Sequence, residues 1–244
     1  MRQWLTAWAE FEALNALANY AFEHPEDAYP TLLPESEATP ATFEATSLGH
    51  PLLPAHICVR NDVALNDATR FYLISGSNMA GKSTLLRAIG TNAVLAYAGA
   101  PVCATSLRLT PLTIGASLAL TDSLAENKSK FLAEVERLHA ILLASQHAPT
   151  LFLVDELFSG TNSHDRCTAA EAVLSSLLHN GAIGALSTHD LALTALATPE
   201  NHGVNVHMAS PDPDDPLAFD FRLKPGVNPS SNALAIIRMM GIEA

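Results

Sequence analysis

The chain has 244 residues, of which 48% are hydrophobic and 16% charged, and its formal net charge is −12. This length and composition are typical of a globular protein with a sizeable core and exclude an intrinsically disordered chain. A protein that grips nucleic-acid phosphates normally carries a basic face, whereas this chain is acidic, so most of any contact with DNA is expected to come from regions outside this chain or from a partner. No apolar run reaches the roughly 18 to 20 residues that cross a bilayer. Since the N-terminus also lacks a secretory signal pattern, a cytoplasmic protein is expected.

The cysteines and histidines do not predict a structural metal site. Cys58, Cys103 and Cys167 lie far apart in the sequence, and none belongs to a CxxC pair. The ten histidines include no HxxxH pair. We therefore expect reduced, buried cysteines and no structural zinc.

The N-terminal part is predicted to be a helix followed by a connector. Residues 1–22 have apolar residues at spacings of three and four, which predicts a helix. Its stripe is largely aromatic and comprises Trp4, Trp8, Phe11, Leu14, Ala18 and Phe22. Frequent prolines predict an extended connector without regular structure over residues 24–54. The expected organisation is thus a helical and proline-rich segment, 1–47, and a catalytic domain, 48–244.

From residue 71 onward, short apolar runs alternate with helical patterns. Strands are predicted at residues 71–74, 151–154 and 183–187, and helices at residues 82–97, 130–145 and 165–179. This alternation is typical of an α/β fold with a mostly parallel sheet flanked by helices. Towards the end, residues 204–208 and 219–223 are predicted to form an antiparallel hairpin and residues 232–240 a last helix.

The strongest motif lies between the first of these strands and the helix that follows it. Residues 76–83 read GSNMAGKS and satisfy the pattern GxxxxGK[ST] of a phosphate-binding loop. Backbone N–H groups of such a loop surround phosphate oxygens at a helix N-terminus, whose dipole favours an anion. Lys82 is predicted to reach the β- and γ-phosphates, and Ser83 to bind Mg²⁺. The predicted phosphate-binding residues are Gly76, Ser77, Asn78, Met79, Ala80, Gly81, Lys82, Ser83 and Thr84.

Paired acids follow the second strand. Four apolar residues, 151–154, lead directly into Asp155 and Glu156, which is the form of a Walker B strand. Asp155 is predicted to hold the hydrated Mg²⁺, and Glu156 to orient or deprotonate the attacking water. Taken alone, the same pattern also fits a strand that ends in a solvated acidic turn.

A histidine ends the third strand, in the run Ser187-Thr188-His189. His189 is predicted to donate a hydrogen bond to the γ-phosphate and so to sense whether that group is present. A lone histidine is often only structural, but its place in the order of strands favours the sensing role.

Together these residues resemble the MutS family of DNA mismatch-repair ATPases, whose ATPase module is similar to that of ABC transporters. The family loop reads GPNMGGKST, from which Ser77 and Ala80 depart. The residues that agree with it are Asn78, Met79, Gly81, Lys82, Ser83 and Thr84. The family segment DELGRGTS, followed by an acid, is matched at Asp155, Glu156, Leu157, Gly160, Thr161, Asn162 and Asp165. The resemblance covers roughly residues 48–242 and implies a P-loop fold of the ABC-ATPase type that binds ATP and Mg²⁺.

Two further segments resemble the family less closely. Residues 122–131, with Glu134, resemble the signature DDLASGRSTF, which in related proteins crosses to the nucleotide of the opposing subunit. The resemblance implies that Ser129 acts in trans; a helix N-cap is its alternative role, and Lys130 replaces the usual threonine. Where the family usually places an aromatic residue near the adenine, this chain has Cys58.

The resemblance implies a homodimer with ATP at the interface, which would act as a nucleotide-driven clamp on DNA in mismatch repair. Residues 1–22 would then be the end of the helical lever that precedes the ATPase domain. The domain with which the family reads mismatches has no counterpart in this chain. An ATP-controlled interaction module without a mismatch-repair role therefore stays open as an alternative. A transporter-type or chromosome-associated ABC ATPase is disfavoured because the chain has no LSGG-type signature.

Overall fold

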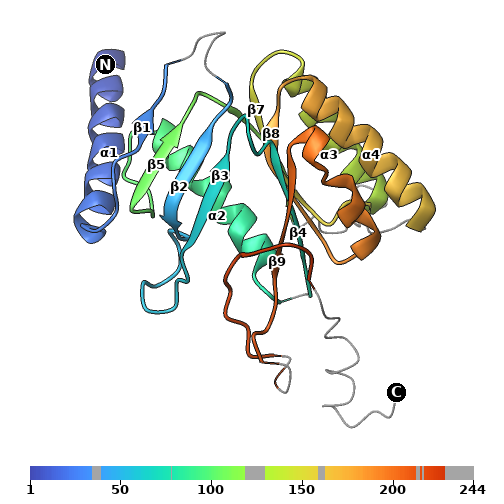
Figure 1. The fold of residues 1–244 in the computed structure, drawn as a ribbon. Helices are drawn as coiled ribbons and strands as arrows, with labels where there is room; N and C mark the ends of the chain where they lie inside the picture. The colour runs from blue at the N-terminus through green and yellow to red at the C-terminus, as the bar shows by residue number, and fades with distance from the viewer. Residues whose placement is uncertain are drawn as a thin grey trace.

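The computed structural model describes residues 1–34, 40–77, 79–118, 130–158, 163–212, 215 and 217–228. In this part of the chain, two β-sheets and several helices form an α/β structure, as the sequence predicts (Figure 1). The predicted site residues Asn78 and Ser129, the motif residues 160–162 and the predicted helix at 232–240 lie outside the described residues.

The larger sheet is almost entirely parallel and has the strand order β10-β9-β4-β8-β7-β6. Its strands are β4 (Phe71–Gly76), β6 (Thr113–Ser117), β7 (Thr150–Asp155), β8 (Ile183–Thr188), β9 (Gly203–Met208) and β10 (Lys224–Pro225). Among the described strands of this sheet, only β10 pairs antiparallel, with β9 at the edge. The central strands β4, β7 and β8 are the three apolar runs of the sequence. They are buried because helices or a second sheet cover both faces.

Helices cover the larger sheet on both faces (Figure 1). On one face lies α2 (Lys82–Tyr97), and on the other lie α3 (Lys130–Ser145) and α4 (Ser163–His179). The predicted bounds of α2 and α3 are confirmed, and α4 begins two residues before its predicted start. Two 3₁₀ helices, Leu191–Leu196 and Pro199–Asn201, connect β8 to β9.

A second sheet occupies part of the region that was predicted to lack regular structure. It has the order β1-β5-β2-β3, with β1 (Thr31–Leu32), β2 (Phe43–Leu48), β3 (Asn61–Leu65) and β5 (Ser106–Leu109). The prediction of a structureless connector over residues 24–54 is therefore wrong for β1 and β2. Pro40 and Pro51 lie outside β2, and Phe43, Ala45 and Leu48 within it are buried. The prolines thus flank this strand and do not interrupt it.

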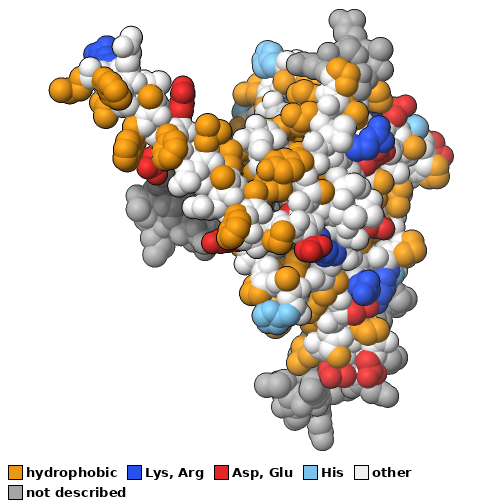
Figure 2. Space-filling model, turned by 90° about the vertical axis from the view of Figure 1, so that its left-hand side faces the viewer, with side chains coloured by type: hydrophobic (Ala, Val, Ile, Leu, Met, Phe, Trp, Pro, Cys, Tyr) orange, Lys and Arg blue, Asp and Glu red, His pale blue; other side chains and the backbone are white. Residues whose placement is uncertain are grey.

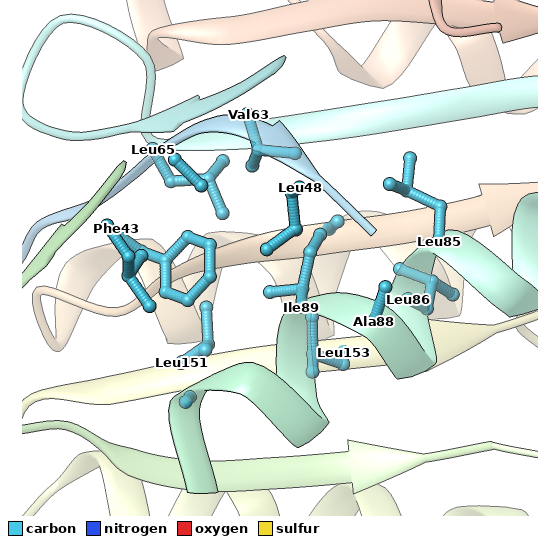
Figure 3. Close-up of a cluster of buried hydrophobic side chains, with 14 of the residues drawn as sticks. Phe43, Leu48, Val63, Leu65, Leu85, Leu86, Ala88, Ile89, Leu151 and Leu153 are labelled. Atoms are coloured by element: carbon cyan, nitrogen blue, oxygen red, sulfur yellow. The ribbon is translucent and has the colours of Figure 1, made fainter. Parts of the chain in front are cut away.

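The two sheets sandwich α2 (Figure 3). Phe43 and Leu48 of the smaller sheet face Ile89 of α2, and Leu151 and Leu153 of the larger sheet lie on the other side of the helix. All five side chains are at most 1% exposed. This packing fixes the start of α2, and with it the glycine-rich loop, against the carboxyl edge of the larger sheet.

The predicted hairpin is only partly correct. β9 agrees with the prediction, but its antiparallel partner is Lys224–Pro225 and not residues 219–223. Phe221 has a φ of 53°, a left-handed conformation that a strand does not accommodate. The Asn61 side chain instead holds this segment: its amide donates to the Phe221 carbonyl at 3.1 Å, and its oxygen accepts from the Leu223 N–H at 2.7 Å.

The predicted N-terminal helix is confirmed as α1 (Arg2–Glu23), but none of its residues is buried. Trp4 is 81% exposed and Trp8 66% exposed. Figure 2 shows the side of the molecule that carries α1, on which hydrophobic side chains lie at the surface. Among the described helices, none is both long and apolar enough to cross a bilayer.

Candidate functional site

The candidate site lies where β4, β7 and β8 end and α2 begins. These strands run parallel and are neighbours in the order β4-β8-β7, so their carboxyl ends meet at one edge of the sheet. The glycine-rich loop follows β4, the paired acids end β7, and His189 follows β8. Ligands of open α/β sheets characteristically bind at this edge.

The backbone of the loop requires glycine at its two ends. Gly76 has a φ of 149°, and a Cβ atom there would lie 2.2 Å from the Met208 carbonyl oxygen. Gly81, which caps the N-terminus of α2, has a φ of 102°. Other residues at these two positions would clash or be strained, so the glycines of the motif are explained by the conformation of the chain.

Two polar groups of the loop are buried. Lys82 is 4% exposed, and its Nζ donates to the carbonyls of Gly76 at 2.8 Å and Ser77 at 2.9 Å. Burial lowers the pKa of the Lys82 ammonium, and the nearby charges of Glu156 and Asp155 act in the opposite direction. The Ser77 hydroxyl oxygen is buried without a hydrogen-bond partner among the described residues. An unpartnered buried hydroxyl is costly, which points to a ligand as its missing partner.

The paired acids are held by β8. The Ser187 hydroxyl donates to Asp155 Oδ1, and the Glu156 N–H donates to the Ser187 carbonyl at 3.2 Å. Glu156 has a φ of 57°, which turns its side chain away from the direction of the strand. His189 Nδ1 lies 3.4 Å from Glu156 Oε1. The histidine that follows β8 therefore contacts the second of the paired acids.

One pocket of about 360 Å³ brings most of the predicted residues together. It is lined by Met79, Gly81, Lys82, Ser83, Thr84, Asp155, Glu156 and Phe221. Gly76 and Ser77 contact it only through Lys82, and Ala80 is buried behind it. His189 borders the pocket through Glu156, whose side chain is 30% exposed.

Phe221 is a site residue that the sequence analysis missed, because it was assigned to a regular strand. It also lines a second pocket of about 250 Å³, which shares Gly81 and Thr84 with the first. The other lining residues are mostly apolar and comprise Leu48, Gly49, His50, Leu53, Ile57, Val59, Asn61, Leu85, Ala88 and Met208. The ring of Phe221 therefore stands between a polar and an apolar pocket.

Cys58, which occupies the position of the expected aromatic residue, does not line either pocket. Its sulfur and that of Cys103 both approach Gly49, where a Cβ atom would lie 2.7 Å and 3.0 Å from them. All three cysteines have free thiols, but only Cys103 is fully buried, so the prediction of buried cysteines is correct only for that residue.

Comparison with protein-family models shows to which family this chain belongs. The family model of MutS domain V matches residues 72–244. The chain belongs to the MutS family. It carries the C-terminal ATPase domain of that family, as the sequence motifs imply.

The MutS domain V match begins in β4 and includes every residue that lines the polar pocket. It also includes His189, as well as Asn78 and Ser129, which lie outside the described residues. By contrast, α1 and the strands β1, β2 and β3 precede it. The candidate site thus lies within the part of the chain that defines membership of the MutS family.

Proposed function

We propose that this MutS-family chain binds ATP and Mg²⁺ at the carboxyl edge of its larger sheet and hydrolyses the ATP. The fold would then be a P-loop NTPase fold of the ABC type. The observation that carries this proposal is the single pocket in which Lys82 meets Asp155 and Glu156. An ammonium ion beside two carboxylates matches what a magnesium triphosphate requires.

The triphosphate would occupy the polar pocket at the start of α2. Lys82 would turn from the Gly76 and Ser77 carbonyls towards the β- and γ-phosphates, and the bound anion would favour its charged form. The unpartnered Ser77 hydroxyl supplies a further donor, and backbone N–H groups at the N-terminus of α2 supply others. These donors support the roles predicted for residues 76–84.

The magnesium ion would be held by Ser83 and Asp155. Both line the polar pocket, and hard oxygen ligands of this kind suit Mg²⁺. The hydrogen bond from the Ser187 hydroxyl occupies one oxygen of Asp155 and orients its carboxylate. When bound, the ion would neutralise charge that develops on the phosphate oxygens.

Glu156 and His189 would act on the attacking water and the γ-phosphate. Glu156 lies in the pocket and its Oε1 contacts His189 Nδ1 at 3.4 Å. We assign Glu156 the role of orienting or deprotonating the water, and His189 the role of sensing the γ-phosphate.

The adenine would occupy the apolar pocket beside Phe221. This pocket adjoins the phosphate site at Gly81 and Thr84, and its lining is apolar as a base requires. Phe221 would stack on the base and so supply the aromatic group that is missing at Cys58. The hydrogen bonds from Asn61 hold Phe221 in this place.

At the level of the assembly, we propose a homodimer with ATP between two copies, in which Ser129 of each copy reaches the other's γ-phosphate. Loss of that group on hydrolysis would open the dimer, because only the triphosphate joins both copies. Such a cycle drives a clamp on DNA in mismatch repair. On the predicted division, residues 1–47 would contain the end of the lever region and residues 48–244 the ATPase domain, with DNA bound by regions outside this chain. Strand β2 crosses this division and packs against α2 of the ATPase domain.

An ATP-controlled interaction module without a mismatch-repair role is the second candidate. The net charge of −12 and Lys130 in place of the signature threonine favour it. The two candidates differ in their response to DNA. Stimulation of ATP turnover by mismatched duplex, measured on the protein purified from its natural source, supports repair, and an unchanged rate supports the interaction module.

The test of the ATPase itself is Glu156→Gln, compared with wild type and with Glu136→Gln on the exposed side of α3. We expect Glu156→Gln to abolish Mg²⁺-dependent phosphate release while ATP binding is preserved and ATP-dependent dimers become more stable. The Glu136→Gln control should behave as wild type. Hydrolysis by Glu156→Gln at the wild-type rate would refute the assignment of Glu156, and a wild-type chain that binds no ATP would refute the proposed function.

A further inference from the structure

A buried carboxyl group lies behind the candidate site. Glu134, one turn into α3, is only 3% exposed. Its Oε1 accepts a short hydrogen bond from the backbone N–H of Phe158. Carboxyl groups are rarely buried to this extent without a specific partner, so this contact calls for a physical reason.

The partner of Glu134 belongs to an irregular turn that carries Glu156. Both Glu156, with a φ of 57°, and Phe158, with a φ of 53°, adopt left-handed conformations although neither is a glycine. Such conformations persist only where the surrounding structure holds them, and they are frequent at functional sites. The side chain of Glu156 points into the polar pocket because of this turn.

The turn is held from two sides. On the β8 side, the carbonyl and hydroxyl oxygens of Ser187 accept from the Glu156 N–H at 3.2 Å and 3.3 Å. On the α3 side, Glu134 binds the Phe158 N–H, and the ring of Phe131 lies 6.0 Å from the ring of Phe158. Residues 131 and 134 lie on the same face of α3, so this helix supports the turn with two adjacent side chains.

We propose that Glu134 is a positioning residue for Glu156. By accepting from the Phe158 N–H, its carboxyl group fixes the turn between residues 155 and 158 and thereby the direction of the Glu156 side chain. Glu134 is not among the residues that line the polar pocket. The inference rests on the proposed function, in which Glu156 acts on the attacking water.

The position of α3 gives this contact a second consequence. The helix begins at Lys130, directly after Ser129, which the family resemblance implies will reach the partner's nucleotide. A displacement of the start of α3 would therefore reach the turn of Glu156 through two side chains, Glu134 and Phe131. Contact with the partner's nucleotide and the geometry of hydrolysis would be coupled through these two contacts.

The experiment compares Glu134→Met, which fills the space without an acceptor, with Glu134→Gln, which retains a neutral acceptor. Glu136→Met, at an exposed position of the same helix, is the control. In Glu134→Met we expect kcat to fall about 100-fold, since small misplacements cost about this much, with KM and ATP affinity within about threefold. In Glu134→Gln we expect kcat about three- to tenfold below wild type, because a neutral acceptor is weaker. The control should be unchanged.

Hydrogen exchange of the Phe158 amide is the second readout. It should be faster in Glu134→Met and moderately faster in Glu134→Gln, while amides of β7 and α3 exchange as in wild type. A folded Glu134→Met enzyme with normal kcat overturns the proposal, and so does an equal loss of ATP affinity and kcat. If Glu134→Met does not fold, the test rests on Glu134→Gln. The proposal is then overturned if the Phe158 amide exchanges at the wild-type rate. It is also overturned if that amide exchanges faster while kcat stays at the wild-type value.

These outcomes are distinct from a failure of the proposed function. A wild-type protein that hydrolyses no ATP would refute the ATPase proposal, whatever the variants do. The exchange rate of the Phe158 amide would still report whether Glu134 holds the turn.

Discussion

His189 Nδ1 lies 3.4 Å from Glu156 Oε1, so the histidine that follows β8 contacts the carboxylate that follows β7. The two residues are far apart in the sequence, but β7 and β8 are parallel neighbours. The contact unites two motifs that the sequence presents separately and gives His189 a place beside the proposed water-activating group.

Replacing His189 by Ala should lower kcat for ATP by about 100-fold, the usual effect of removing one donor to a transition state. ATP affinity should change little, because the phosphate loop and Phe221 stay intact. Steady-state phosphate release and equilibrium ATP titration measure the two quantities. His147→Ala, at an exposed turn after α3, is the control. A His189→Ala protein with full turnover would leave His189 a structural residue only.

Phe221→Ala should weaken ATP binding by about 1 to 3 kcal/mol, as loss of aromatic stacking on a base does. Phe221→Tyr should retain the affinity. Binding of inorganic tripolyphosphate should change much less than binding of ATP, because Phe221 lines the polar pocket with an apolar ring that donates no hydrogen bond to phosphate. Competition titrations with ATP and tripolyphosphate test this, and Leu217→Ala, which alters neither pocket, is the control. Equal losses for both ligands would contradict the assignment of the base pocket.

Gly184→Ala should destabilise the fold by about 3 kcal/mol or more, because a methyl group in this tightly packed place forces the backbone to move. A Cβ atom at Gly184 would lie 2.0 Å from the Phe152 carbonyl oxygen in the neighbouring strand. Gly90→Ala in α2 is the matched comparison, since its Cβ would meet only the end of the Leu153 side chain at 2.9 Å. In Gly90→Ala, the higher helix propensity of alanine should offset the cost of moving the Leu153 side chain, so the free energy of unfolding should change little. Urea unfolding measures the free energy of unfolding of both variants. If Gly184→Ala were as stable as Gly90→Ala, the packing between β7 and β8 would have more freedom than the structure indicates.

Cys103 should react slowly with iodoacetamide in the folded protein. Burial raises the pKa of its thiol to about 11, and the nearby Asp27 carboxylate adds to this, while the thiolate is the reactive form. The rate should therefore rise steeply above pH 9. Because the pKa of this thiol is higher in the folded than in the unfolded protein, keeping the thiol protonated stabilises the folded state. This contribution to the free energy of unfolding is present below pH 9 and is lost as the pH rises towards 11.

Mass spectrometry of alkylated peptides, in native buffer and in urea, checks this prediction. At pH 8, the alkylation rate in native buffer divided by the rate in urea should be small for Cys103. It should be closer to one for Cys167, which is only partly buried. Equal rates for Cys103 in both conditions would mean that the packing around Gly49 opens readily.

The sequence by itself determined the local parts of this protein. Strand β4, the glycine-rich loop and α2 are consecutive, and of the paired acids Asp155 ends β7 and Glu156 directly follows it. Periodicity and turn chemistry act over a few residues, so these elements follow from the chain alone. The same holds for α1, although its aromatic stripe did not reveal that it would remain exposed.

Only the tertiary structure decided how distant segments meet. Asn61 holds the backbone of Phe221, Glu134 binds the Phe158 N–H, and Cys58 and Cys103 both approach Gly49. The smaller sheet is likewise a product of packing, since β2 is stabilised by strands and by α2 and not by a local pattern. Such contacts depend on side chains brought together by the whole fold, which no short stretch of sequence encodes. The glycine-rich loop between β4 and α2 was therefore predictable, whereas the proposed base pocket and the contact of Glu134 with the turn of Glu156 were not.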